Sequence, residues 1–253
     1  MLTKNRLKYY SSLLNKKERQ SENKFLVEGR KLLYEALNSG YECEVIFALN
    51  QFVEDHYDFI EYAEHKGAHI EIIKSQELNK ITDTQTPQGA VGVFLFPRQA
   101  ENLIENESLI AALENISDPG NVGTIFRNCD WFGVKNILLN NECAETYNPK
   151  VIRASAGSVF HLNIFKEDDF YGSLEKMKSR GYKILCADLN GVNLYDYKKN
   201  EKEIIVFCNE ANGPSDILLS ITDQKITIPK IGEAESLNVA SASAVILAEL
   251  IRK

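Results

Sequence analysis

The sequence predicts an α/β protein built in two parts, and three observations lead to this prediction. The chain has 253 residues, 44% hydrophobic and 26% charged, which is an ordinary globular composition with ample material for a core. Its length fits one or two domains. Apolar runs of strand length alternate with amphipathic segments along the whole chain, and this order is typical of α/β folds.

The first alternating series occupies the N-terminal part. A basic amphipathic segment opens the chain, and Gly40 ends a helix-like stretch over residues 31–37. A further helix is expected near residues 53–66, and strands are expected at 25–27, 44–49, 70–73 and 90–96. Pro97 and Arg98, followed by a polar stretch, indicate a linker, so we predict domains at residues 1–98 and 99–253.

The second series follows the linker. We expect helices over residues 124–132, 168–180 and 236–252, and strands at 109–113, 136–139, 159–165, 183–187, 203–207 and 225–228. Several of these strand runs are continuously apolar rather than alternating. That pattern is typical of a parallel sheet covered by helices on both faces, which is the architecture predicted here.

The charge is distributed unevenly. The formal net charge is -7, but residues 1–31 have nine basic and three acidic side chains, a local charge of +6. The other 222 residues therefore sum to -13. This contrast indicates a polyanionic partner at the basic end, although a solvated lysine-rich helix is the structural alternative. An acidic protein is not expected to coat nucleic acid indiscriminately.

No apolar run approaches the roughly 18 residues of a membrane span, and the N-terminus lacks the apolar stretch of a secretory signal. We therefore expect a cytoplasmic protein. The cysteines are odd in number and mostly lie inside apolar runs, which predicts buried free thiols rather than disulfides. They are Cys43, Cys129, Cys143, Cys186 and Cys208. No metal site is expected, because Gly67 interrupts the only close histidine pair, His65 and His69.

Ligands of parallel α/β sheets bind beyond the carboxyl ends of the strands, so we expect catalytic and ligand-binding residues in the turns that follow the strands. In the first such turn, Asp118-Pro119-Gly120 reverses the chain and a helix is expected to open at Asn121. Free N–H groups at a helix start attract anions, and Arg127 could bind a phosphate with two hydrogen bonds. A plain capped turn with a surface arginine is the alternative.

Two later turns have similar features. Glu210 lies three residues after the strand expected at 203–207, where it could face a substrate or cap a helix that begins at Pro214. Ser236 is an N-cap candidate for the last helix, which is rich in small residues. Neither the dinucleotide fingerprint G-x-G-x-x-G nor a P-loop occurs, so the sequence gives no main indication of a dinucleotide-binding or P-loop nucleotide site.

Together, in this order and spacing, the three turns resemble the signature motifs of the SpoU (TrmH-like) RNA 2'-O-ribose methyltransferases of the SPOUT superfamily. The matching positions are Asn115, Asp118, Pro119, Asn121, Gly123, Arg127, Asn209, Glu210, Gly213, Ile228, Pro229, Gly232 and residues 236–239. The segment 153–157 also resembles a segment of the same family. Residues 25–29 and 86–89 are similar to the N-terminal substrate-binding domain that many members have.

This resemblance implies a particular fold and activity. The C-terminal domain would contain a trefoil (α/β) knot, bind S-adenosyl-L-methionine in the knot loops and work as a homodimer. A smaller α/β domain before it would bind the RNA substrate. The activity implied is 2'-O-ribose methylation of a structured RNA, with rRNA favoured over tRNA.

The resemblance also implies roles for individual residues. Those expected at the cofactor are Ala187, Leu189, Cys208, Asn209, Gly213, Ile228, Gly232 and Leu237. The catalytic set would be Arg127, Asn121, Glu210, Ser236 and Asn238, and RNA contacts are expected from Arg127, Arg153, Lys16, Lys17 and Arg30. The family arginine that corresponds to Arg127 is a proposed general base. Because a guanidinium stays protonated in nearly every protein site, phosphate anchoring is an equally good account of Arg127.

The chain departs from the family pattern at three positions. Cys208 and Ala211 stand where the family usually has glycine, and Lys230 replaces a usual methionine. A side chain at either glycine position could narrow the cofactor pocket. One alternative is therefore a non-catalytic RNA-binding protein of the same fold. Two further alternatives are an enzyme that methylates a base instead of a ribose, and a nucleotide-dependent dehydrogenase that lacks the usual glycine fingerprint.

Overall fold

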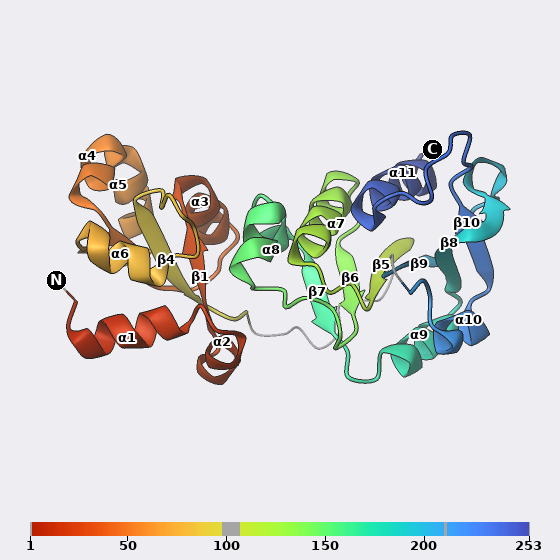
Figure 1. Ribbon diagram of the computed structural model, residues 1–253, viewed down its shortest axis with the longest axis horizontal. Coiled ribbons are helices and arrows are strands. Elements are labelled where there is room, and N and C mark those ends of the chain that lie inside the picture. Colours follow the sequence, from red (N-terminus) through yellow and green to blue (C-terminus); the bar gives the residue numbers. More distant parts are fainter. Residues whose placement is uncertain (1, 98–106, 210–211, 253) are drawn as a thin grey trace. The chain divides into compact units, whose positions relative to one another are not determined.

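The computed structural model describes residues 2–97, 107–209 and 212–252 (Figure 1). Its contacts divide the chain into two compact units. Unit 1 comprises residues 1–98 together with the segment 145–160, and unit 2 comprises residues 99–144 and 161–253. Nothing in the sequence pattern indicated that 145–160 would pack with the N-terminal part. No helix in the described ranges is long and apolar enough to cross a membrane.

Unit 1 is an α/β unit with a mixed sheet in the order β1-β4-β2-β3. Strand β4 is antiparallel to β1 and β2, and β2 is parallel to β3. The strands are β1 (Lys24–Glu28), β2 (Cys43–Ala48), β3 (Ile70–Ile72) and β4 (Ala90–Leu95). The helices are α1 (Lys4–Ser12), α2 (Lys16–Glu22), α3 (Arg30–Asn38), α4 (Asn50–Asp55), α5 (Tyr57–His65), α6 (Ser75–Ile81) and α8 (Pro149–Ala154).

The strands predicted for unit 1 are confirmed to within two residues, but two predictions about helices were incomplete. The helix expected over residues 53–66 is two helices, because His56 between α4 and α5 has the non-helical dihedrals φ -135° and ψ 43°. Helices α6 and α8 were not predicted. Both are short, with 7 and 6 residues, so neither offers a clear helical period in the sequence.

Unit 2 is built on a sheet in the order β10-β8-β9-β5-β6-β7, in which every pairing is parallel, as predicted. The strands are β5 (Leu109–Glu114), β6 (Asn136–Leu139), β7 (Asn163–Lys166), β8 (Lys183–Asn193), β9 (Glu203–Cys208) and β10 (Gln224–Thr227). The helices are α7 (Pro119–Trp131), α9 (Phe170–Ser179), α10 (Asp216–Ile221) and α11 (Val239–Ile251), and a 3-10 turn, η2 (Leu194–Asp196), follows β8.

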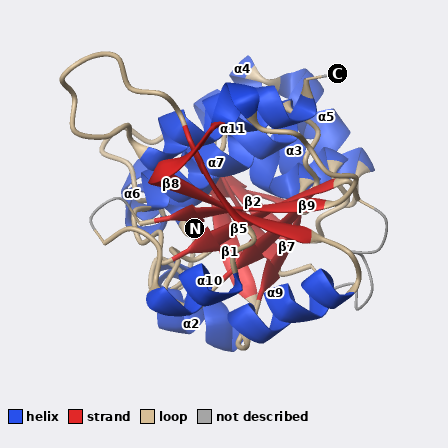
Figure 2. Cartoon of the chain, turned by 90° about the vertical axis from the view of Figure 1, so that its right-hand side faces the viewer, coloured by secondary structure: helices blue, strands red, loops and turns tan. Residues whose placement is uncertain are grey.

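The helices of unit 2 cover both faces of the sheet. Figure 2 shows α7 and α11 together on one face and α9 with α10 on the other. Strands β5 and β9 between them are buried at every residue, which explains why all their residues except Glu114 and Glu203 are apolar. The order of the strands does not define how the chain is threaded, so the trefoil knot remains a prediction.

Two predictions in unit 2 were wrong in detail. Residues 159–165 are not one strand: a 3-10 helix, η1 (Ser158–His161), precedes β7, because Ala156 and Gly157 turn the chain through positive φ angles of 53° and 101°. The last helix begins at Val239 and not at 236. Its N-cap is Asn238, whose Oδ1 accepts the N–H groups of Ala240 (3.0 Å) and Ser241 (3.3 Å).

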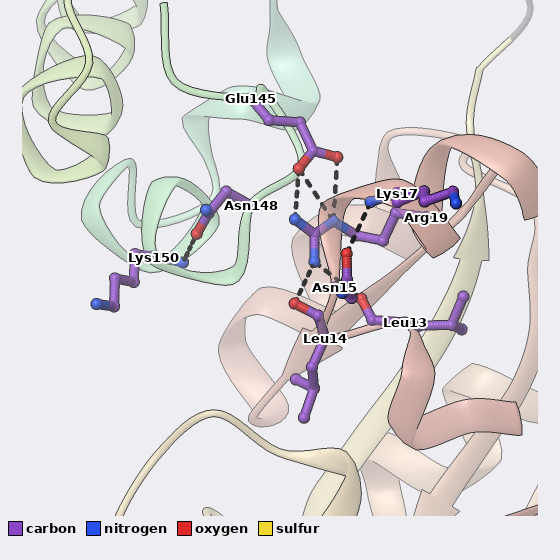
Figure 3. Close-up of polar contacts among 8 residues, drawn as sticks. All are labelled: Leu13, Leu14, Asn15, Lys17, Arg19, Glu145, Asn148 and Lys150. Carbon is purple, nitrogen blue, oxygen red and sulfur yellow. Dashed lines mark hydrogen bonds and ion pairs between the residues drawn. The ribbon is translucent and has the colours of Figure 1, made fainter. Parts of the chain in front are cut away.

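A buried ion pair holds the segment 145–160 within unit 1. Arg19, on α2, is 1% exposed, and its Nε donates to Glu145 Oε1 at 3.0 Å (Figure 3). The same guanidinium donates to the backbone carbonyls of Leu13 and Leu14 at 2.8 Å each. Leu13 is buried and the Glu145 side chain is 9% exposed, while Leu14 is partly buried. The pair therefore fixes both the turn before α2 and the chain leading into α8.

Replacing Arg19 with alanine would leave the Glu145 carboxylate buried without its cation. We expect the free energy of unfolding to fall by about 3–5 kcal/mol, measured by urea unfolding followed by circular dichroism. The matched control is Arg6→Ala, since the Arg6 guanidinium is 44% exposed in its 2.7 Å ion pair with Glu71. That pair should contribute less than about 1 kcal/mol, and equal losses in the two variants would contradict the assignment.

Candidate active site

The three motif turns begin at one edge of the unit 2 sheet. Strands β5 and β9 pair in parallel so that Glu114, the last residue of β5, lies opposite Cys208, the last residue of β9. Parallel strands direct their carboxyl ends to the same edge, and the turns after β5, β9 and β10 all start there. The sheet thus gathers three turns, of which the first and the last start more than 100 residues apart in the sequence.

The first turn starts α7. Asp118 is the N-cap, its Oδ1 accepts the Asn121 N–H at 2.8 Å, and Pro119 occupies the first helical position. The helix therefore begins at Pro119, two residues before the opening expected at Asn121 and five before the predicted range 124–132, because proline needs no hydrogen-bond acceptor at this position. Arg127 lies further along α7, is exposed, and forms no ion pair with any described residue. Its guanidinium is available to an external anion.

The structure brings two of the predicted catalytic residues together. Asn238 Nδ2 donates to Asn121 Oδ1 at 3.0 Å, so the N-cap of α11 is bonded to the first turn of α7. Asn128 reinforces this arrangement, since its Nδ2 donates to the Ala240 carbonyl at 2.8 Å and to Ser243 Oγ at 2.9 Å. Ser236 is exposed and makes no hydrogen bond with another described residue. The hydrogen bond between Asn121 and Asn238 therefore joins the first motif to the third, and Ser236 takes no part in it.

The second turn begins with a cysteine that faces the core. Cys208 is 7% exposed and its Sγ lies 3.9 Å from Cys186 Sγ, inside a cluster of buried apolar residues. Contact with Cys186 and burial both raise the pKa of the Cys208 thiol. Asn209 and Gly213 are partly buried, and Gly213 has a positive φ of 64°. The predicted residues Glu210 and Ala211 lie outside the described residues.

Strand β8 contains an excursion at the place where two cofactor contacts were predicted. Its pairing with β10 passes from Cys186↔Lys225 directly to Val192↔Ile226, so residues 187–191 leave the ladder. Two contacts tie the excursion to β10: Lys225 Nζ lies 3.1 Å from Asp188 Oδ2, and Thr227 Oγ1 donates to the Leu189 carbonyl at 3.1 Å. Ala187 is partly buried, whereas Leu189 is 66% exposed.

A glycine that the sequence analysis missed makes this excursion possible. A Cβ atom at Gly191 would lie 2.6 Å from the Lys225 carbonyl carbon, so no other residue fits without a backbone shift. The dipeptide Asn190-Gly191, a common turn sequence, was the available signal.

The third turn, from residue 228 to residue 238, is largely exposed. Ile228 is partly buried, Leu237 is 49% exposed and Ile231 is 99% exposed. Gly232 is exposed as well, and a Cβ atom there would meet nothing within 4 Å. Apolar side chains that face solvent beside backbone polar groups are suited to binding a ligand with both characters.

Unit 1 contains the other residues for which RNA contacts were predicted. Lys16, Lys17 and Arg30 are exposed there. Arg153 also belongs to unit 1, where its Nη2 donates to Asp83 Oδ2 at 2.9 Å. Its cation is thus partly neutralised, which weakens the case for Arg153 as a contact to phosphate.

Unit 1 also contains the three segments that resemble the family outside the motif turns, at residues 25–29, 86–89 and 153–157. Glu28 accepts the Gln88 N–H at 3.2 Å, and a Cβ atom at Gly157 would lie 2.8 Å from Glu35 Cγ. These segments therefore have close-packing roles. The part of the chain that the structure describes contains no group of three or more metal-ligating side chains.

The fold and these turns agree with comparisons to known proteins. Residues 108–248 match the SpoU rRNA methylase family, and residues 4–92 match the MRM3-like substrate binding domain. The first match covers more than half of the chain, so the protein belongs to the SpoU rRNA methylase family, and the resemblance predicted from the three motifs is confirmed.

Individual relatives match along almost the whole chain. The 23S rRNA (guanosine(2553)-2'-O)-methyltransferase RlmP of Bacillus subtilis is 30% identical over 247 residues, which is 97% of this chain and 95% of the relative. The solved structure of an AdoMet-bound rRNA methyltransferase from Sinorhizobium meliloti is 27% identical with a TM-score of 0.86, covering 99% of this chain and 95% of that one. The SpoU methyltransferase AviRb of Streptomyces viridochromogenes shares the fold, with a TM-score of 0.87 at 23% identity, over 98% of this chain and 97% of its own.

The excursion in β8 provides a test of the site's architecture. We expect Gly191→Ala to lower the free energy of unfolding by roughly 1–3 kcal/mol, because the added methyl group meets the backbone of Lys225. Gly232→Ala is the matched control in open space and should change stability by less than about 0.5 kcal/mol. Thermal or denaturant unfolding measures both variants. A Gly191→Ala protein as stable as the control would refute the close approach.

Proposed function

We propose that this protein transfers a methyl group from S-adenosyl-L-methionine to the 2'-hydroxyl of a ribose in a structured RNA, with ribosomal RNA as the substrate class. Family membership supports RNA methyl transfer, and the 2'-O-methyltransferase RlmP supports the ribose as acceptor. In this proposal residues 1–98 form the RNA substrate-binding domain and residues 99–253 form the methyltransferase domain.

One observation supports the proposal most strongly. The hydrogen bond between Asn238 and Asn121 joins the first and third motifs on α7 and α11, and Arg127 lies exposed on α7. Two asparagines and an arginine around one edge of a sheet can bind a ribose hydroxyl and its neighbouring phosphate, which are polar and anionic. We assign the catalytic work to this group, together with Glu210, and give Ser236 at most a secondary role.

The residues at the edge of the sheet fit the cofactor. Leu189 and Leu237 present exposed apolar side chains next to backbone polar groups, which suits an adenine ring with a polar edge. The Cys208 side chain is buried in the core against Cys186, and we propose that it therefore leaves room for the cofactor. We propose that the cofactor is held by Ala187, Leu189, Cys208, Asn209, Gly213, Ile228, Gly232 and Leu237, mainly through their backbones.

When bound, S-adenosyl-L-methionine supplies an electrophilic methyl group on a positively charged sulfur. Arg127 is proposed to anchor the phosphate beside the target ribose and so to orient the 2'-oxygen. Because a guanidinium stays protonated, we assign the removal of the hydroxyl proton to the phosphate or to Glu210. Asn121 and Asn238, fixed by their mutual hydrogen bond, would hold the ribose in place.

RNA binding is proposed for the exposed cations of unit 1. Lys16, Lys17 and Arg30 are free of ion pairs with described residues, whereas Arg6, Arg19 and Lys24 are bonded to glutamates. The basic arm therefore offers a limited set of cations to RNA phosphates. Arg153 would first have to leave Asp83 before it could bind a phosphate.

The proposal includes a homodimer in the cytoplasm. Trp131, at the end of α7, is 83% exposed, and a solvated tryptophan is typical of a surface that a partner covers. Helix α11 lies beside α7 and ends in the partly exposed Ile251, so the two helices offer one face to a second copy. The cytoplasmic location follows from the proposed substrate, ribosomal RNA.

Arg127→Ala tests the catalytic assignment. We expect turnover to fall by about 10²–10³-fold, because an anchor for charge at the reacting group is removed, while the Kd for S-adenosyl-L-methionine changes by less than about twofold. Methyl transfer to RNA and calorimetric titration of the cofactor measure the two effects. The control is Arg252→Ala, an exposed arginine at the end of α11. Full activity in Arg127→Ala would refute the assignment.

The role of the basic arm is tested by reversing two charges. The double variant Lys16→Glu, Lys17→Glu should weaken RNA binding and reduce the slope of log K against log salt by roughly 0.7–0.9 for each phosphate that the protein no longer neutralises. Lys80→Glu, an exposed lysine on α6, is the control. Filter-binding or fluorescence anisotropy titrations at several salt concentrations give both quantities. An unchanged slope in the double variant would contradict RNA binding by α2.

A further inference from the structure

The carboxyl end of β5 holds a charged residue that the proposed reaction does not use. Glu114 is fully buried, and its carboxylate accepts three hydrogen bonds. Oε1 accepts from Ser215 Oγ at 2.6 Å and from the Tyr171 hydroxyl at 2.7 Å, and Oε2 accepts from the Ser215 N–H at 3.1 Å. A buried carboxylate is costly unless its oxygens are satisfied, so this arrangement strongly favours one geometry.

Two of these three donors belong to Ser215, which is the residue where the second motif turn ends. Ser215 is the N-cap of α10, and its Oγ accepts the Leu218 N–H at 3.1 Å while it donates to Glu114. Burial is the main cause that raises the pKa of Tyr171, so this hydroxyl keeps its proton and remains a donor. Glu114 therefore fixes the point at which the chain leaves the turn and enters α10.

Asn115, which follows Glu114 in the sequence, fixes the start of the second motif turn, whose end is fixed by Glu114. Asn209 Nδ2 donates to the Asn115 carbonyl at 3.1 Å. Asn115 has a positive φ of 58°, a conformation that asparagine tolerates better than most residues. Asn140 stabilises it through a reciprocal pair, in which Asn115 N donates to Asn140 Oδ1 at 3.0 Å and Asn140 Nδ2 donates to Asn115 Oδ1 at 2.6 Å.

We infer that Glu114 is a positioning residue for cofactor binding, which together with Asn115 fixes Asn209 and Ser215 at the edge of the sheet. This inference rests on the proposed function, because it assigns the cofactor to the backbone of Asn209 and Gly213. A turn held at both ends before the ligand arrives loses less conformational entropy on binding. Glu114 thus acts on cofactor affinity through Ser215, and touches neither the cofactor nor the RNA.

Two hydroxyl groups bound to the same carboxylate allow a matched test. Ser215→Ala removes the donor at the end of the turn, whereas Tyr171→Phe removes a donor that lies on α9. We expect Ser215→Ala to raise the Kd for S-adenosyl-L-methionine about tenfold, with kcat at saturating cofactor within about twofold of wild type. Tyr171→Phe should leave the Kd within about twofold, although it removes a hydrogen bond from the same oxygen. Ser215→Thr restores the hydroxyl and should restore the affinity.

Calorimetric titration of the full chain gives these Kd values, and denaturant unfolding shows whether each variant is folded. If Ser215→Ala does not fold, Glu114→Gln replaces it, since an amide has a single acceptor oxygen and cannot satisfy all three donors. Equal affinities for wild type and Ser215→Ala, or equal losses in Ser215→Ala and Tyr171→Phe, would overturn the positioning role. Wild-type protein that fails to bind the cofactor would instead overturn the proposed function.

Discussion

The parallel pairing of β5 with β9 is the constraint on which the rest of unit 2 depends. One register, from Leu109↔Glu203 to Glu114↔Cys208, brings the turns that follow both strands to the same edge of the sheet. Because both strands are buried on both faces, a shift of one residue would exchange which side chains face which layer of helices. The positions of Asn115, Asn121 and Asn209 follow from this register.

Local hydrogen bonds then convert the shared edge into a defined site. Asn121 and Asn238 join α7 to α11, and the β8 excursion is tied to β10 through Lys225 and Thr227. In each case a polar side chain bonds to a residue from another part of the sequence, through a side chain at Asn121 and Asp188 and through a backbone carbonyl at Leu189. Such preorganisation is what a site needs if it binds a cofactor mainly through backbone groups.

The sequence predicts those features whose causes are local, and several predictions of this kind were confirmed. Continuously apolar runs such as residues 204–207 predict strands buried on both faces, and the motif spacing identifies the family. Features that depend on distant partners could not be predicted. Both Ser236 and Asn238 satisfy the local rule for an N-cap, and the observed choice of Asn238 goes with its bond to Asn121.

Long-range packing also changes the interpretation of charge and of single residues. Arg19 looked like one more cation of the basic arm, but its guanidinium is buried against Glu145, 126 residues away. Cys208 departs from the family's glycine, yet its thiol is buried in the core against Cys186. The net charge of -7 is therefore compatible with RNA binding through a few exposed cations.

The most direct test is to transfer a labelled methyl group from S-adenosyl-L-methionine to ribosomal RNA, digest the product to nucleosides and identify the labelled one by mass spectrometry. Ribosomal RNA from cells that lack the protein is the substrate, so that the target position is unmodified. The account predicts a single nucleoside that has gained a methyl group on its ribose. Label on a base, or no label with intact and folded protein, would contradict it.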